Sequence, residues 1–220
     1  MPLATWQALC MDARDAPAVA GFWAAVLGLS PADESDGSIR LAGDEDDQQV
    51  WVNPVPEAKS VKHRVHLDVE VGDLAGIEEL GATVLRPPGD DRTWWVMADV
   101  EGGEFCAFVR DHRPSLPGRL YEVVVDCADP GAQSAWWAEV MGLQCEDDAL
   151  SGALPFDYLC FGSVPEPKAA KNRVHWDVEA PDVPALVAAG ARILRRPDDE
   201  ISWHVLADPE GNEFCAFSPQ

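Results

Sequence analysis

The segment WHVLADPEGNEFCAF (Trp203 to Phe217) decides the fold, because it repeats WWVMADVEGGEFCAF (Trp94 to Phe108) at a displacement of 109 residues. Eleven of the fifteen positions are identical. Each segment contains two short apolar runs joined by a turn of Glu and Gly, which predicts a β-hairpin. Identity of this extent within one chain indicates an internal duplication.

The duplication extends toward the N-terminal end of each copy. VKHRVHLDVEVGD (Val61 to Asp73) matches AKNRVHWDVEAPD (Ala170 to Asp182) at the same displacement of 109 residues. Further upstream, GFWAAVLGL (Gly21 to Leu29) recurs as AWWAEVMGL (Ala135 to Leu143), displaced by 114. The second copy is therefore shorter between its first helix and its second strand unit.

A charged, Pro-rich segment, RDHRPSLPGR (Arg110 to Arg119), lies between the two copies. Pro-rich segments of this kind are typical of linkers. We therefore expect two tandem domains, at residues 1–109 and 117–220, joined by a linker at 110–116.

Each copy reads as strand, helix and further strands, and this pattern occurs twice per copy. The first helix of each copy is expected to begin after a capping Asp, at Asp15 or Asp129, and to stop at Gly28 or Gly142. Apolar residues at three- and four-residue spacing give each helix one inward face. The pattern predicts an α+β protein with four βαβββ units, which form two curved, barrel-like sheets that each enclose a cavity.

The composition excludes several classes of protein. The 16 basic and 39 acidic residues leave a formal charge of −23, which disfavours binding to nucleic acid. No apolar run reaches the roughly 18 residues needed to cross a bilayer, and the N-terminus lacks the pattern of a secretion signal. The six cysteines form no CxxC pair, which predicts reduced core thiols. We expect a soluble cytoplasmic protein without a membrane partner.

Paired βαβββ units with the helix FWxxxLGL, the strand RVHxDV and the turn DPEGNEF resemble the glyoxalase-like domains of the vicinal-oxygen-chelate superfamily. That superfamily includes glyoxalase I, extradiol dioxygenases, and fosfomycin-resistance and bleomycin-binding proteins. The resemblance covers nearly the whole chain, twice. It implies a divalent metal ion that chelates two adjacent substrate oxygens and is held by residues of the first and last strands of the units.

The resemblance assigns metal ligands position by position. The first-strand ligand of the second unit falls on His175, and that of the first unit falls on Glu122, where copy one has Ala8. The last-strand ligand has two candidates, Glu213 and Cys215, which strand alternation places on one face. We expect copy two to be the active copy, with Glu122, His175 and either Glu213 or Cys215 as ligands. Glu122 and Glu213 are also the candidate catalytic groups for proton transfer.

Copy one retains only a partial set, His66, Glu104 and Cys106, and is expected to be degenerate. Imidazole, carboxylate and thiolate ligands suit Zn, Mn, Fe or Ni. The alternative is that no metal binds, and that the acid and the His form hydrogen bonds in a polar cavity.

Two functions remain open at this point. The first is a metal-dependent enzyme for a small-molecule substrate, with lyase, isomerase or dioxygenase chemistry. The second is a metal-free protein, like the bleomycin-resistance proteins, that sequesters a planar hydrophobic compound between aromatic rings. Trp176, Trp203 and His204 are the candidate substrate-binding residues in either case. Both a monomer and a homodimer are compatible with this pattern.

Overall fold

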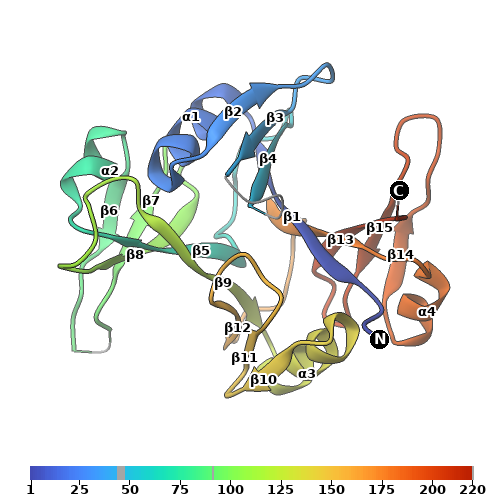
Figure 1. Cartoon of the computed structure of the whole chain (residues 1–220). Coiled ribbons are helices and arrows are strands. Elements are labelled where there is room, and N and C mark those ends of the chain that lie inside the picture. The colour runs from blue at the N-terminus through green and yellow to red at the C-terminus, as the bar shows by residue number, and fades with distance from the viewer. Residues whose placement is uncertain (44–47, 91, 220) are drawn as a thin grey trace.

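The computed structural model describes residues 1–43, 48–90 and 92–219. Within these residues the strands form two eight-stranded mixed sheets (Figure 1), which are curved but do not close. The first sheet contains, in spatial order, β14 (Arg192–Arg195), β15 (His204–Ala207), β16 (Glu213–Phe217), β13 (Val174–Glu179), β1 (Thr5–Ala13), β4 (Gln49–Pro54), β3 (Ile39–Ala42) and β2 (Ser30–Asp33). The second sheet contains β10 (Gln144–Glu146), β11 (Ala149–Ser151), β12 (Tyr158–Ser163), β9 (Arg119–Cys127), β5 (Val65–Val71), β8 (Glu104–Val109), β7 (Trp95–Ala98) and β6 (Thr83–Arg86).

Each sheet combines one unit from each copy. In the first sheet β1 of copy one pairs antiparallel with β13 of copy two, and Cys10 lies opposite His175. In the second sheet β5 pairs antiparallel with β9, and Asp68 lies opposite Glu122. The four units and two curved sheets expected from the sequence are confirmed. The sheets, however, do not follow the copy boundaries.

The long helices begin and end where the sequence predicts. Helix α1 (Ala16–Leu27) is capped by the Asp15 carboxylate, and α3 (Pro130–Met141) by that of Asp129. Both end at a glycine in the left-handed conformation, with φ of 69° at Gly28 and 65° at Gly142. Such angles strain residues that carry a Cβ. Two short helices, α2 (Ala75–Glu79) and α4 (Val183–Ala188), complete the units.

Helices α1 and α3 lie between the two sheets and fill the core. Helix α1 packs on β2, β3 and β4 of the first sheet, while its Trp23 contacts Phe105 of the second sheet. Helix α3 packs on β12, while its fully buried Trp137 contacts Trp176 and Phe214 of the first sheet, at centroid distances of 4.8 and 5.0 Å. The face of each sheet turned away from these helices is called its outer face.

No helix in the described part of the chain is long and apolar enough to cross a membrane. All six cysteines are free thiols, and four of them are buried, as the sequence predicts.

Candidate functional site

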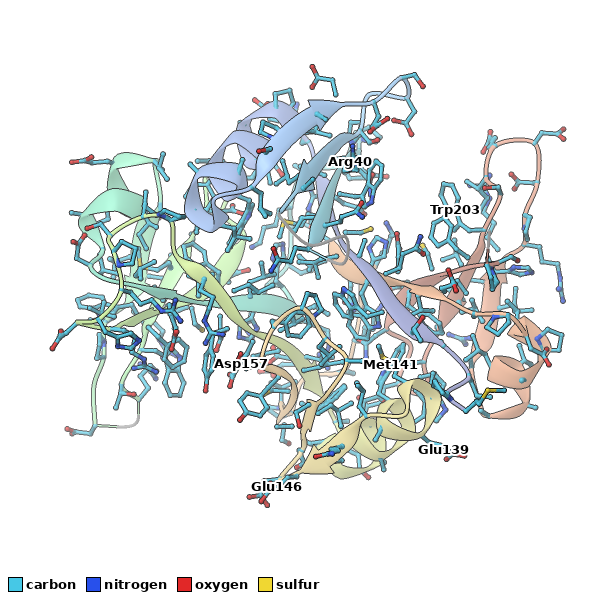
Figure 2. All side chains as sticks on the ribbon, viewed as in Figure 1. Arg40, Glu139, Met141, Glu146, Asp157 and Trp203 are labelled. Atoms are coloured by element: carbon cyan, nitrogen blue, oxygen red, sulfur yellow. The ribbon has the colours of Figure 1, made fainter. Side chains whose placement is uncertain are left out.

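The outer face of the first sheet carries a cavity of about 600 Å³. Strands β1, β4, β13, β14, β15 and β16 and the loops beside them contribute its lining residues. Trp51 and Trp203 are among the aromatic lining residues, and Figure 2 labels Trp203 just before β15. The Trp203 ring stacks on Phe217, with 5.2 Å between centroids and 26° between planes. The cavity therefore has an apolar, aromatic side.

A compact polar cluster, formed by Cys10, His175, Asp177 and Cys215, lies against this cavity. Alternation along β13 places His175 and Asp177 on one face, and the pairing of β1 with β13 brings Cys10 opposite His175. The Cys10 thiol donates to Asp177 Oδ2 over 3.2 Å, and Cys215 Sγ lies 3.7 Å from His175 Nε2. One ligand atom each from Cys10, His175 and Asp177 lies within 4.8 Å of the others.

Burial favours the uncharged form of each group in this cluster. It raises the pKa of the Cys10 thiol, and the neighbouring Asp177 raises it further. Burial also raises the pKa of Asp177 and lowers that of His175. His175 Nδ1 and Asp177 Oδ1 are both buried and have no hydrogen-bond partner among the described residues. Unpartnered buried groups of this kind are costly, so they point to a ligand that the two side chains could share.

These residues fit a divalent metal ion. Imidazole and thiolate are the ligands that zinc prefers, and a carboxylate can complete such a site. Binding would require the Cys10 and Asp177 protons to be released, because metals bind the deprotonated forms. A bound cation would also compensate the negative charge of the buried Asp177 carboxylate.

Glu213 lies along the same cavity, but both of its carboxylate oxygens are already bonded. They accept from Lys168 Nζ over 2.8 Å and from the Asn172 backbone N–H over 3.1 Å. Copy one repeats the arrangement, because Glu104 accepts from Lys59 Nζ over 2.8 Å and from the backbone N–H of residue 63 over 2.9 Å. Both glutamates therefore fasten the loop that precedes β13 or β5.

The structure does not bring Glu122 to His175, and this corrects the expected grouping. Glu122 lies on β9 in the second sheet, opposite Asp68, while His175 lies on β13 in the first sheet. The cause is strand pairing between the copies, which separates the two units of copy two. For the same reason Cys10, from the copy expected to be degenerate, joins His175. No local feature of the sequence marks this exchange of partners.

The second sheet holds a related cluster on its outer face. Ligand atoms of His66, Asp68 and Cys106 lie within 4.8 Å of one another, and His66 Nε2 is 3.4 Å from Asp68 Oδ1. Burial lowers the pKa of His66 to about 4. Burial and the adjacent Glu122 raise the pKa of Asp68 to about 7. The partial set expected in copy one therefore gains its extra carboxylate, Glu122, from copy two.

The three expected substrate-binding residues do not lie together in the structure. Trp203 lines the cavity. Trp176 is fully buried against α3 and belongs to the core. The prediction that it contacts substrate is therefore wrong. His204 begins β15 between Trp203 and Val205, which both line the cavity, so alternation turns His204 toward the opposite face. Trp51 of β4 also lines the cavity.

Two curved sheets of paired βαβββ units define the vicinal-oxygen-chelate class of fold. The glyoxalase-like domain family matches residues 8–108 and 122–217, and the chain belongs to this family.

Several solved structures share the fold at low sequence identity. Glyoxalase I from Zea mays is 13% identical, with a TM-score of 0.66 over 97% of this chain and 92% of that chain. A putative dioxygenase from Bacillus subtilis is 11% identical, with a TM-score of 0.62 over 99% and 86%. The cppA protein from Streptococcus pneumoniae is 11% identical, with a TM-score of 0.58 over 98% and 100%. No curated protein matches the sequence.

Proposed function

We propose that the chain is a metal-dependent enzyme for a small-molecule substrate, and that its working site is the outer face of the first sheet. Cys10, His175 and Asp177 would hold a divalent ion, with Cys215 beside them. One observation carries the proposal: three ligand atoms within 4.8 Å of one another lie against a cavity of about 600 Å³. A bound ion would polarise a substrate oxygen as a Lewis acid.

The chain's own residues supply the remaining functions. The stacked rings of Trp203 and Phe217, with Trp51, offer an apolar surface for a planar part of the substrate. Asp177 Oδ1 has no hydrogen-bond partner among the described residues, so this oxygen is available to contact the ion. Glu213 acts in this proposal by holding the loop at Lys168, in place of the catalytic role expected from the sequence. A cytoplasmic location and a monomer or homodimer remain predictions.

Elemental analysis of protein purified without chelator or a metal-affinity column tests the metal. We expect about one divalent ion per chain, as a single tetrahedral site implies. His175→Ala should lose that ion, whereas His204→Ala, the matched control on the opposite face of β15, should keep it. A metal-free wild type, or equal metal content in both variants, would contradict the proposal.

The second candidate is a metal-free binding protein for a planar hydrophobic compound. The aromatic side of the cavity favours it, as does the burial that favours the uncharged forms of Cys10 and His175. Chelator-treated protein should then bind a planar dye such as anilinonaphthalene sulfonate, and Trp203→Ala should weaken this binding. Trp94→Ala removes the corresponding stack on Phe108 of the second sheet and serves as the control. Equal dye binding by both variants would remove this candidate.

A further inference from the structure

A second cavity, of about 340 Å³, lies where the two copies meet. The repeat-equivalent segments 61–64 (VKHR) and 170–173 (AKNR) both line it. They precede β5 and β13, so the cavity lies beside both sheets. Lys171 lines this cavity and also the cavity of the first sheet.

Positive charge is concentrated in this cavity, although the chain carries a net charge of −23. Its lining includes four cationic side chains, from Lys62, Arg64, Lys171 and Arg173, and two carboxylate residues, Asp126 and Glu166. Like charges gathered in one pocket repel each other unless an anion compensates them. The pocket therefore has more cationic than carboxylate lining residues, in contrast to the acidic chain as a whole.

Three of the four cations have a carboxylate partner. Lys62 pairs with Asp126 and Lys171 pairs with Asp12. Arg173 forms an ion pair with Glu101 over 3.0 Å.

Arg64 is the exception. Its guanidinium donates to two neutral backbone oxygens, those of Glu166 over 2.8 Å and Asp126 over 2.9 Å. Its Nε is buried without a hydrogen-bond partner, and no carboxylate of the described residues forms an ion pair with Arg64. The Arg64 guanidinium therefore has no direct ion-pair partner among the described residues.

The repeat shows why Arg64 lacks an acid. Glu101 bonds the Asp15 backbone N–H with one oxygen and Arg173 with the other. The corresponding residue of copy two, Glu210, uses both oxygens on backbone N–H groups, those of residues 128 and 129, over 2.7 Å each. Glu210 therefore does not supply the carboxylate that Arg64 needs.

We propose that this cavity binds a small oxyanion, a phosphate or a carboxylate group, with Arg64 as its anchor. A guanidinium has five N–H donors, of which two are used here, and its fork matches the oxygens of such anions. The side chains of Lys62 and Lys171 are 61% and 57% exposed, so both ammonium groups can turn toward a bound anion. The inference does not depend on the metal cluster.

Calorimetric titration at low ionic strength tests the proposal, with inorganic phosphate and acetate as separate probes. We expect Arg64→Gln to bind the preferred anion about tenfold more weakly, as loss of a charged hydrogen-bond donor implies. Arg40→Gln makes the same change in net charge outside the cavity and should bind like the wild type. His175→Ala should also retain binding, which separates this site from the metal cluster.

The proposal is overturned if the wild type binds neither phosphate nor acetate. It is also overturned by equal weakening in Arg64→Gln and Arg40→Gln, or by a loss that follows His175→Ala alone. Should Arg64→Gln fail to fold, the Arg64 Nε–H resonance of the wild type replaces it, assigned by its absence in Arg64→Lys. A phosphate- or acetate-dependent shift of this resonance is expected, and an unchanged resonance contradicts the site.

Discussion

The two outer-face clusters share three residues and differ in what the opposing strand contributes. Strands β13 and β5 carry the same His-x-Asp pair, and β16 and β8 carry the same Cys. The opposing strand differs: Cys10 lies opposite His175, whereas Val124 lies opposite His66. Conversely, Ala8 lies opposite Asp177 in the first sheet, and a carboxylate, Glu122, occupies that position in the second. One diverged strand therefore gives each duplicated half-site its own chemistry.

The outer faces also differ in how they are covered. In the second sheet Trp94, Phe108 and Tyr121 pack in a row, with centroid distances of 5.6 and 5.8 Å. The residue of the first sheet that corresponds to Tyr121 is Gln7, which lines the open cavity. The open cavity is why our proposal puts ligand binding on the first sheet. The following predictions test the differences between the two sheets.

The largest effect is expected on stability, from the core residues that follow the two histidines in sequence. Trp176 and Leu67 follow His175 and His66 and point into the core, where Trp176 contacts Trp6 and Trp137. Trp176→Ala should lower the free energy of unfolding by about 4 kcal/mol, and Leu67→Ala by about 3 kcal/mol, because each leaves a cavity. Urea denaturation measures both. A loss well below 1 kcal/mol for Trp176→Ala would return this ring to the substrate-binding residues.

The next effect concerns the paired carboxyls of the second sheet. Burial and Glu122 raise the pKa of Asp68 to about 7, above its unfolded value. At about pH 3 and below, Asp68 is protonated in both the folded and the unfolded state and its raised pKa costs almost nothing; stability is lost as the pH rises from about 4 to about 7. Asp68→Asn should recover about 3 kcal/mol at about pH 8 and almost nothing at about pH 3.

Asp177→Asn is the matched variant in the first sheet. The pKa of Asp177 is also raised by burial, but Ala8 stands where Glu122 stands in the second sheet. In metal-free protein we expect a gain of the same sign and smaller size, measured by unfolding across the same pH range. An equal gain from both variants would show that Glu122 has no part in the difference.

The smallest effect distinguishes loop positioning from metal binding. Glu213→Gln and Glu104→Gln should each cost about 1 to 2 kcal/mol, because each leaves a largely buried lysine without its carboxylate partner. The metal affinity of Glu213→Gln should stay within about threefold of the wild type. Loss of the ion in this variant would restore Glu213 as the ligand that the sequence suggested.

Local patterns predicted the local features of this molecule. The capping aspartates, the terminal glycines and the hairpins depend on residues close together in the chain, and they form where expected. The placement of His175 on the outer face follows in the same way from alternation along β13. The partner strand does not, because β1 and β9 are equivalent first strands of the two copies and their local sequence does not state which copy each one pairs with. This is why Cys10 was missed and Glu122 was assigned to the wrong cluster.

The exchange of units between copies sets an order of assembly during synthesis. All strands of the second sheet lie between residues 65 and 163, whereas the first sheet needs residues 5–54 together with 174–217. The second sheet can therefore complete while β1, bonded on one side to β4, still waits for β13. Until then one edge of β1 is an open template for pairing with another nascent chain. The N-terminal and C-terminal units of the chain thus pair last, and the cavity of the first sheet is the final part of the molecule to form.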